Sequence, residues 1–503
     1  MIARKSALIV ATHILNAIFG YVTLFFISKF MSPWEYGIVG FAFGFVALFQ
    51  VFGNLGFESA HVKRISEGKD LGTCIGTFFT IRMGLMGFMT IIVMGAIFFW
   101  RFGLGYGFES PTHETAIYIM LVYCILSIFT NSIISTFKAR KEIAKVEFPL
   151  FFEVLARTTA TIFVALLGYG ALALVSTYLV GWGALALSAL YLFRGYPIKK
   201  PNKEYFKDYS EFAFPLIIVI ACSTIITNID KVLIQLFWSS SDVGYYFAAL
   251  RLMIFVNMFT IAIGILLFPT FSLLHINNNI DAIRKLIFRS ERYLSMIVFP
   301  LVFMVVALAE PTVRILLSGW MPAVSILQIL TFFVLLAALE QPYQSQFLGM
   351  NQPKLARNRV IIMVFVNIIL NILLIPKNIQ MFGMNLAGMG ARGAAIATVI
   401  SYSIGLVYSR VMAWKLTAIS GNPRILMHAL AAAVMAVILH WLNIIAPIIR
   451  WYHLIGVIFI GVGIYFSILF LLNEFSKKDF DFFFDTLNIK KMLNYIKNEI
   501  KEK

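Results

Sequence analysis

Residues 229–252 read IDKVLIQLFWSSSDVGYYFAALRL: an apolar run, a short polar turn and a second apolar run. A serine caps the first turn of a helix, and an acidic residue there suits the helix dipole. Ser239 and Asp242 therefore predict that a new helix begins just after Trp238. Long apolar helices joined by short polar turns are typical of a protein that crosses a membrane several times.

The composition of the whole chain agrees with this stretch. The 503 residues are 60% hydrophobic and only 13% charged, whereas an average soluble domain is about 45–50% apolar and about 25% charged. A soluble protein of this size cannot cover so much apolar surface with so few charges. The composition excludes most cytosolic enzymes, disordered chains and secreted disulfide scaffolds.

Spanning segments follow from length and apolarity, because a membrane helix needs about 20 mainly apolar residues. Charge clusters and Pro, Gly and Asn turns divide the chain into fourteen such segments, at about 6–29, 36–58, 74–99, 115–137, 148–168, 170–193, 211–237, 243–268, 290–309, 322–345, 358–376, 391–413, 425–447 and 452–473. We therefore predict an all-α, polytopic membrane protein with 14 transmembrane helices.

The basic residues set the predicted orientation. The net charge is +17, which in a soluble protein would suggest a nucleic-acid partner. In a membrane protein, Lys and Arg collect in cytoplasmic loops. With the N-terminus inside, 31 of the 41 basic residues fall in inside segments and 6 in outside ones. This predicts a cytoplasmic (plasma) membrane protein with both termini cytoplasmic and no nucleic-acid partner.

A weak internal repeat suggests the domain organisation. Residues 32–37 read SPWEYG and residues 239–244 read SSSDVG, and GYGALALV at 168–175 resembles ARGAAIATV at 391–399. Two six-helix lobes in a parallel, pseudo-twofold arrangement account for this spacing, with two helices appended. The predicted units are an N-terminal lobe at 1–200, a C-terminal lobe at 201–420, two further helices at 421–475 and a basic cytoplasmic tail at 476–503. The amphipathic tail either lies on the anionic inner leaflet or is a frayed soluble helix.

Motifs for catalysis and cofactors are missing. The chain has no phosphate-binding P-loop, and its one G-x-G-x-x-G, at Gly388, Gly390 and Gly393, follows no predicted strand. The histidines have no metal-ligand spacing, and the three cysteines form no CxxC pair. Short predicted external loops argue against a membrane glycosyl-transfer enzyme. We expect a protein that is not an enzyme and has no cofactor, metal or catalytic residue.

Charged residues inside the predicted spans are the candidate functional groups, because a charge at mid-bilayer costs about 2.5–3.5 kcal/mol on insertion scales. Basic candidates for a central cavity are Lys231, Arg251, Arg157 and Arg82, of which Arg82 either joins this group or snorkels to the inner surface. Arginine suits phosphate, so such a cavity predicts an anionic substrate.

The acidic candidates are Asp230, Glu153 and Glu340. Glu153 and Arg157 are spaced i,i+4 and can pair on one helix face, either as a structural pair or within a cavity. Asp230 and Lys231 are adjacent, so they point about 100° apart on a helix. Glu340 lies in the polar run EQPYQSQ beside Pro342, and this run suggests the lining of a hydrated path.

Several longer stretches together resemble a known family. They are SPWEYGIVGFAF (32–43), GFESAHVKRISEG (56–68), IDKVLIQLFWSSSDVGYYFAALRL (229–252), LLSGWMPAVSILQIL (316–330), FLGMNQPKLARN (347–358), VNIILNILLIP (366–376) and GARGAAIATVIS (390–401). In this order they are similar to the polysaccharide-transporter (Wzx-type oligosaccharide flippase) branch of the multidrug/oligosaccharidyl-lipid/polysaccharide exporter superfamily.

The resemblance implies a fourteen-helix fold with two lobes around a central cavity. It implies alternating-access translocation of an oligosaccharide on a polyprenyl phosphate or pyrophosphate carrier, for surface polysaccharide biosynthesis. The implied partners are this lipid-linked oligosaccharide, membrane lipid and glycan-assembly proteins. The basic candidates would then hold the phosphate, and Asp230, Glu153 and Glu340 would be ion or proton sites. A cation-coupled multidrug exporter of the same fold is the alternative, against which the embedded bases count.

Overall fold

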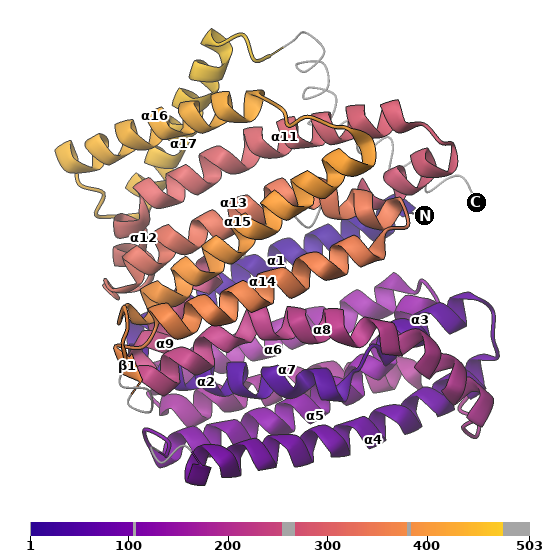
Figure 1. The fold of residues 1–503 in the computed structure, drawn as a ribbon. Helices are drawn as coiled ribbons and strands as arrows, with labels where there is room; N and C mark the ends of the chain where they lie inside the picture. Colours follow the sequence, from indigo (N-terminus) through magenta and orange to yellow (C-terminus); the bar gives the residue numbers. More distant parts are fainter. Residues whose placement is uncertain (1, 104–106, 254–266, 380–383, 476–503) are drawn as a thin grey trace.

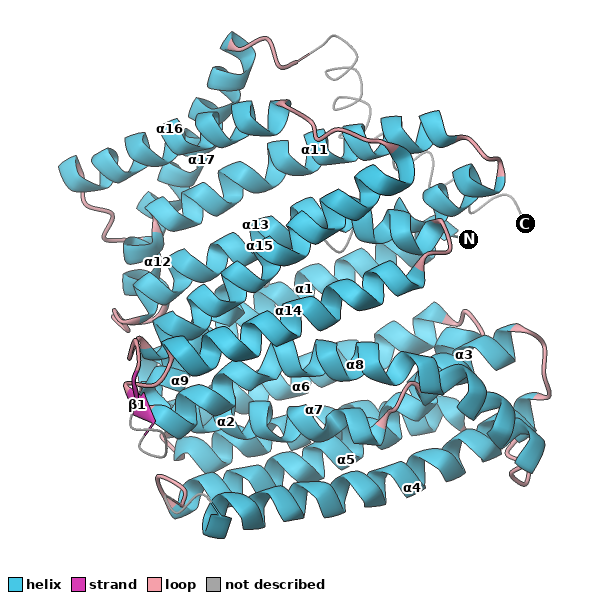
Figure 2. Cartoon of the chain, in the orientation of Figure 1, coloured by secondary structure: helices cyan, strands magenta, loops and turns pink. Residues whose placement is uncertain are grey.

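The computed structural model describes residues 2–103, 107–253, 267–379 and 384–475, and these residues are almost entirely helical (Figures 1 and 2). The helices of the first half are α1 (Ile2–Phe30), α2 (Pro33–Phe49), α3 (Phe57–Ser66), α4 (Leu71–Phe98), α5 (Pro111–Ala139), α6 (Ile143–Leu167) and α7 (Gly170–Phe193). Those of the second half are α8 (Lys203–Phe237), α9 (Ser240–Leu252), α11 (Ile280–Ala307), α12 (Ala309–Leu316), α13 (Ala323–Gly349), α14 (Pro353–Leu374), α15 (Gly390–Thr417), α16 (Arg424–Ile445) and α17 (Trp451–Leu471).

The all-α membrane architecture predicted from the sequence is confirmed, but the count of 14 spans is not. Among the described residues, 12 helices are long and apolar enough to cross a membrane. Two shorter apolar helical stretches are also present: Leu15–Phe30 overlaps the predicted first span, and Leu267–Ile276 begins where the predicted eighth span, 243–268, ends. Part of the predicted span 243–268 and the predicted tail at 476–503 lie outside the described residues.

One predicted span is broken in the structure. The sequence predicts a continuous span at 36–58, but α2 ends at Phe49 and is followed by a 3-10 turn, η1 (Gln50–Gly53), and then by α3. Leu55 and Gly56 have φ angles of 44° and 84°, which no α-helix contains. Gly56 favours this interruption, because glycine adopts the left-handed conformation at no steric cost.

The two copies of the repeated turn begin two helices in the same way. Ser32 and Glu35 form a capping box at the start of α2, and the Ser239 hydroxyl accepts from the amide of Asp242 at the start of α9. These caps satisfy backbone N–H groups that have no partner within the helix. We call the end of the molecule that carries both turns the capped end.

At the capped end, α2 and α9 pack in direct backbone contact. A Cβ at Gly37 would lie 1.6 Å from the carbonyl oxygen of Ser240, and a Cβ at Gly244 would lie 2.0 Å from that of Pro33. Only glycine permits this approach, and it is required at the same position of both repeats. The large aromatic side chains of Tyr36 and Phe247 fill the neighbouring space, with ring centroids 5.1 Å apart.

Helix α8 contacts helices from both halves of the chain. It packs against α2, α3 and α4 on one side and against α14 and α15 on the other. The last two helices lie at the edge of the molecule, where α16 and α17 pack against α11 (Figure 1). A two-residue hairpin, β1 (Asn378–Ile379) with β2 (Met384–Asn385), precedes α15.

Candidate functional site

Three of the predicted cations surround one cluster of aromatic side chains. The Lys231 ammonium lies 5.7 Å from the ring centroid of Phe43, the Arg251 guanidinium 5.0 Å from Phe247, and the Arg157 guanidinium 5.6 Å from Tyr178. The Phe43 ring in turn lies 6.2 Å from Tyr178 and 6.3 Å from Phe247. Helices α2, α6, α7, α8 and α9 thus bring these cations to one place. We call Lys231, Arg251 and Arg157 the cationic cluster.

The cluster lies well inside the membrane region. At 1.5 Å per helical residue, Arg251 is about 17 Å from the start of α9, Arg157 about 15 Å from the end of α6, and Lys231 about 9 Å from the end of α8. These three helix ends belong to the capped end, and the hydrocarbon core is about 30 Å thick. Arg157 and Arg251 line a small cavity of about 30 Å³ together with Tyr36, Tyr178 and Thr161. Arg251 also donates to the Tyr178 hydroxyl at 3.2 Å.

Positive charge exceeds negative charge in the cluster. Arg157 donates to Glu153 at 2.6 Å, which confirms the i,i+4 pairing predicted from the sequence. Within the described chain, the side-chain contacts of Arg251 and Lys231 include no carboxylate within ion-pair distance. The Lys231 ammonium instead donates to the carbonyl of Thr227 at 2.9 Å and to the side-chain oxygen of Asn228 at 2.8 Å. The cluster therefore carries uncompensated charge that an anionic ligand can neutralise.

Asp230 points away from its neighbour Lys231 and into a cage of polar groups. Its carboxylate accepts from the Tyr246 hydroxyl at 2.5 Å, from the Asn371 amide at 2.6 Å and from the Thr398 hydroxyl at 3.0 Å. These partners come from α9, α14 and α15, and all are buried or nearly so. The Asn371 side-chain oxygen and the Asn367 side-chain nitrogen have no partner in the described structure. The Asp230 carboxylate, the two hydroxyls and the unpartnered Asn371 oxygen are the kinds of oxygen atom that a small cation binds.

Arg82 lies apart from the cationic cluster. It is only 3% exposed, so it does not snorkel to a surface. Its guanidinium donates to the carbonyls of Gly53 at 2.7 Å and Ile128 at 3.3 Å, and to the Ser132 hydroxyl at 3.2 Å. These bonds tie α4 to α5 and to the break after α2. The contacts favour a structural role for Arg82, because four of its five N–H groups already donate to the protein.

Glu340 is likewise enclosed by protein. It is 1% exposed and forms an ion pair with Arg359 of α14, and it accepts from the Ser409 hydroxyl of α15 at 2.8 Å. Arg359 lies near the start of the predicted span 358–376, and in the structure it is buried within α14. The interpretation of this run as the lining of a hydrated path finds no support in these contacts, since the carboxylate is satisfied by neighbouring helices.

The capped end contains a polar network that sequence reasoning missed. The Glu109 carboxylate accepts from the backbone amide and hydroxyl of Ser240 at 3.0 and 2.5 Å, from Gln235 at 2.7 Å and from the Trp34 indole at 3.0 Å. His113 adds a bond to the Ser240 hydroxyl at 2.7 Å. Glu109 lies just before α5, so it links the first half of the chain to α8 and α9 in the second. No local spacing predicts contacts between residues so far apart in the sequence.

The chain matches the model of one known family, and its structure is similar to two solved membrane-protein structures. Residues 26–325 match the model of the family described as polysaccharide biosynthesis protein. The structure is similar to that of a lipid II flippase, MurJ, in an inward closed conformation, with a TM-score of 0.72, 16% identity, and coverage of 92% of this chain and 98% of the other. It is also similar to a multidrug-resistance MATE family transporter in an inward-facing conformation, with a TM-score of 0.64, 16% identity, and coverage of 81% and 96%. At this identity the two likenesses show the fold alone.

One curated relative adds to this comparison. A probable low-salt glycan biosynthesis flippase, Agl15 of Haloferax volcanii, is 27% identical over 179 residues. The alignment spans 35% of this chain and 36% of the archaeal protein, about a third of its length.

Proposed function

We propose that this multi-pass membrane chain, which belongs to the polysaccharide biosynthesis protein family, moves a lipid-linked oligosaccharide across the membrane. The substrate would carry its sugar on a polyprenyl phosphate or pyrophosphate. The membrane would be the cytoplasmic membrane, with both termini on the inner side, as the distribution of Lys and Arg predicts. Its other partners would be the proteins that assemble the glycan.

The observation that carries the proposal is the cationic cluster. Burying Lys231 and Arg251 in a membrane without a carboxylate partner is costly, so such residues mark a functional site. Both lie beside aromatic rings, an environment that suits a phosphate with a sugar attached. Arginine binds phosphate through two parallel hydrogen bonds, and Arg251 and Arg157 line the same cavity.

The capped end supplies the gate in this proposal. Two lobes, at about 1–200 and 201–420, would alternate between access from either side, with residues 421–475 attached to the second lobe. In the present state α2 and α9 are in backbone contact at the capped end, so the substrate would enter from the opposite end. Opening the capped end requires separating Gly37 from Gly244 and releasing Glu109 from Ser240.

Asp230 is the ion site that the contacts support best among the three acidic candidates. Glu153 and Glu340 are each paired with an arginine, whereas Asp230 has only neutral hydrogen-bond donors. Helices α8, α9, α14 and α15 meet at its carboxylate, so occupancy by Na⁺ or a proton would change how these helices pack. Such a site would couple an ion gradient to the movement of the lobes.

The alternative is a cation-coupled multidrug exporter, which has a fold of the same kind. An organic cation would be repelled by Lys231 and Arg251, because no carboxylate in the described chain forms an ion pair with either of them. The cationic cluster therefore favours the anionic, lipid-linked substrate.

The test is a flipping assay in proteoliposomes that hold a fluorescent polyprenyl-pyrophosphate-linked oligosaccharide. Lys231→Ala combined with Arg251→Ala is expected to slow flipping by more than about tenfold, since each charged hydrogen bond is worth about 1.5–3 kcal/mol. Lys29→Ala with Arg450→Ala removes two exposed cations of the capped end and is the matched control. Wild-type flipping by the first double variant, with equal protein in the vesicles, would refute the proposal. Transport of a cationic dye in place of the lipid would favour the exporter.

A further inference from the structure

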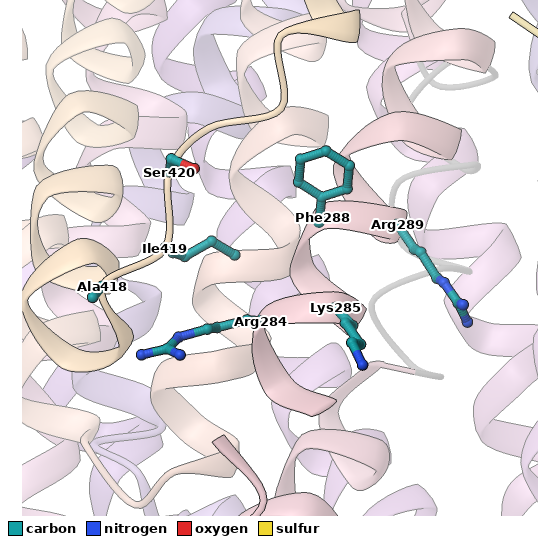
Figure 3. A pocket seen from close by; sticks show the side chains of 7 residues that line it. All are labelled: Arg284, Lys285, Phe288, Arg289, Ala418, Ile419 and Ser420. Atoms are coloured by element: carbon teal, nitrogen blue, oxygen red, sulfur yellow. The ribbon is translucent and has the colours of Figure 1, made fainter. Parts of the chain in front are cut away.

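A second cationic site lies at the other end of the molecule, away from the cationic cluster. The first turns of α11 and the 418–420 segment after α15 border an open pocket of about 290 Å³ (Figure 3). Arg284, Lys285 and Arg289 line it, together with Phe288. The start of α11 and the connection from α15 to α16 lie opposite the capped end (Figure 1). The pocket is therefore separate from the proposed transport site.

Two of the three cations are unpaired in the described part of the chain. Arg284 pairs with Asp281 at 2.9 Å and donates to the carbonyl of Thr417 at 2.5 Å. Lys285 and Arg289 have no hydrogen bond or ion pair there, and both are exposed. Figure 3 shows Arg284 reaching beneath Ala418, while Lys285 and Arg289 extend outward from α11.

The neighbouring carboxylate does not neutralise these cations. Glu291 is fully buried and is held by Arg410 at 2.7 Å and by the Tyr343 hydroxyl. It also accepts from the amide of Asn422 at 3.1 Å. The pocket thus keeps its positive charge, which an anion can bind.

Apolar side chains beside the pocket indicate that this anion belongs to a lipid. A second pocket of about 270 Å³ shares Ile419 and Ser420 with the first and is lined by Val411 and Trp414. Trp414 is 58% exposed and Val411 43% exposed. Tryptophan is enriched where a membrane meets water, so the cations border a surface that faces lipid. A soluble anion would gain nothing from this apolar surface.

We propose that these two pockets bind one anionic phospholipid, with its phosphate on Lys285 and Arg289 and its first acyl carbons against Val411 and Trp414. Basic pockets between membrane helices on the cytoplasmic side recognise anionic headgroups in this way. Arg284 already joins α11 to the last carbonyl of α15. A lipid held beside it links α11 to the segment that leads into α16, and so stabilises the attachment of the last two helices.

Native mass spectrometry of the full chain, titrated with phosphatidylglycerol, tests this site. Lys285→Gln with Arg289→Gln is expected to raise the dissociation constant of the most tightly bound lipid about tenfold or more, because two interfacial cations are lost. Lys200→Gln with Lys207→Gln, which removes two exposed cations outside these pockets, is the matched control and should bind as the wild type does. Trp414→Ser should also weaken binding although it leaves the charge unchanged. Equal weakening by the control pair, equal binding of phosphatidylcholine, or displacement of the lipid by millimolar inorganic phosphate would each overturn the proposal.

Discussion

Gly37 and Gly244 contact each other's helix in a reciprocal way. A Cβ at Gly37 would lie 3.1 Å from the backbone nitrogen of Gly244, and a Cβ at Gly244 would lie 3.2 Å from that of Gly37. The two residues hold the same position in the two copies of a repeated turn, so each helix presents the same contact to the other. The backbones of α2 and α9 therefore touch directly at the capped end.

Gly37→Val and Gly244→Val are each expected to prevent closure of the capped end. The added side chain would meet a backbone carbonyl at 2.0 Å or less, and backbone cannot move aside without separating α2 from α9. Hydrogen–deuterium exchange at residues 33–40 and 240–247 should increase, and flipping should fall more than about tenfold because the cycle lacks a closed state.

Gly87→Val and Gly95→Val are the controls for this prediction. Both glycines face open space on α4, with no atom near the added Cβ. If all four variants show the same exchange and activity, then the close approach of α2 and α9 does not form the gate.

Acidification at the capped end is expected to favour its opening. Burial by itself would raise the pKa of Glu109, but the hydrogen bonds from Ser240, Gln235 and Trp34 outweigh it and lower this pKa. In an open state the carboxyl has the ordinary pKa of about 4.3. The ionised carboxyl therefore stabilises the closed state relative to the open state when the pH is above about 4.3. This stabilisation is lost as the pH falls through the lower pKa that Glu109 has in the closed state.

Glu109→Gln should reproduce this effect at neutral pH. The substitution should lower the stability of the closed state relative to the open state by about 1 kcal/mol, after allowance for the exposure of the side chain. This corresponds to about a fivefold fall in the ratio of closed to open molecules. Distances between spin labels across the capped end measure this ratio. An identical response to pH in wild type and Glu109→Gln would show that another group controls opening. Glu114→Gln, in the same region but with exposed partners, is the control.

Asp230→Asn is expected to remove the dependence of flipping on a cation gradient. The substitution keeps the size of the side chain and abolishes its charge, so neither Na⁺ nor a proton can be exchanged there. The measurement is the initial flipping rate in vesicles with and without imposed Na⁺ and pH gradients. Glu211→Gln removes an exposed carboxylate from the same helix and should leave the dependence intact. A gradient response that survives in Asp230→Asn would contradict the assignment.

Glu340 and Arg359 are expected to behave as a structural pair. Removing one partner of a buried pair leaves an uncompensated charge, which costs about 3–5 kcal/mol. Glu340→Gln should therefore lower the thermal unfolding temperature strongly, and Glu340→Leu with Arg359→Met should recover most of it. Unfolding of the detergent-solubilised protein measures the effect. A stable Glu340→Gln protein with lost cation coupling would instead make Glu340 an ion site.

Much of the architecture follows from the sequence alone. Apolar runs of sufficient length must form helices in a membrane, because backbone polar groups there have no water to bind. Spacing within one helix also determines the nearest neighbours, so the pairing of Glu153 with Arg157 and the divergence of Asp230 from Lys231 could both be predicted. The break after Phe49 was missed, because a 3-10 turn and a left-handed glycine interrupt the helix without interrupting the apolar run.

Tertiary structure alone decided which embedded charges meet. The sequence marks Arg82 and Arg251 as equivalent basic residues in apolar surroundings, yet only Arg251 joins the cationic cluster. Likewise, nothing local pairs Glu340 with Arg359 or brings Glu109 to Ser240 across 131 positions of the chain. Helical periodicity orders residues within a turn or two, whereas contacts between helices depend on which faces pack together. That packing is set by the whole set of side chains at each interface, and it is what turns scattered charges into a site.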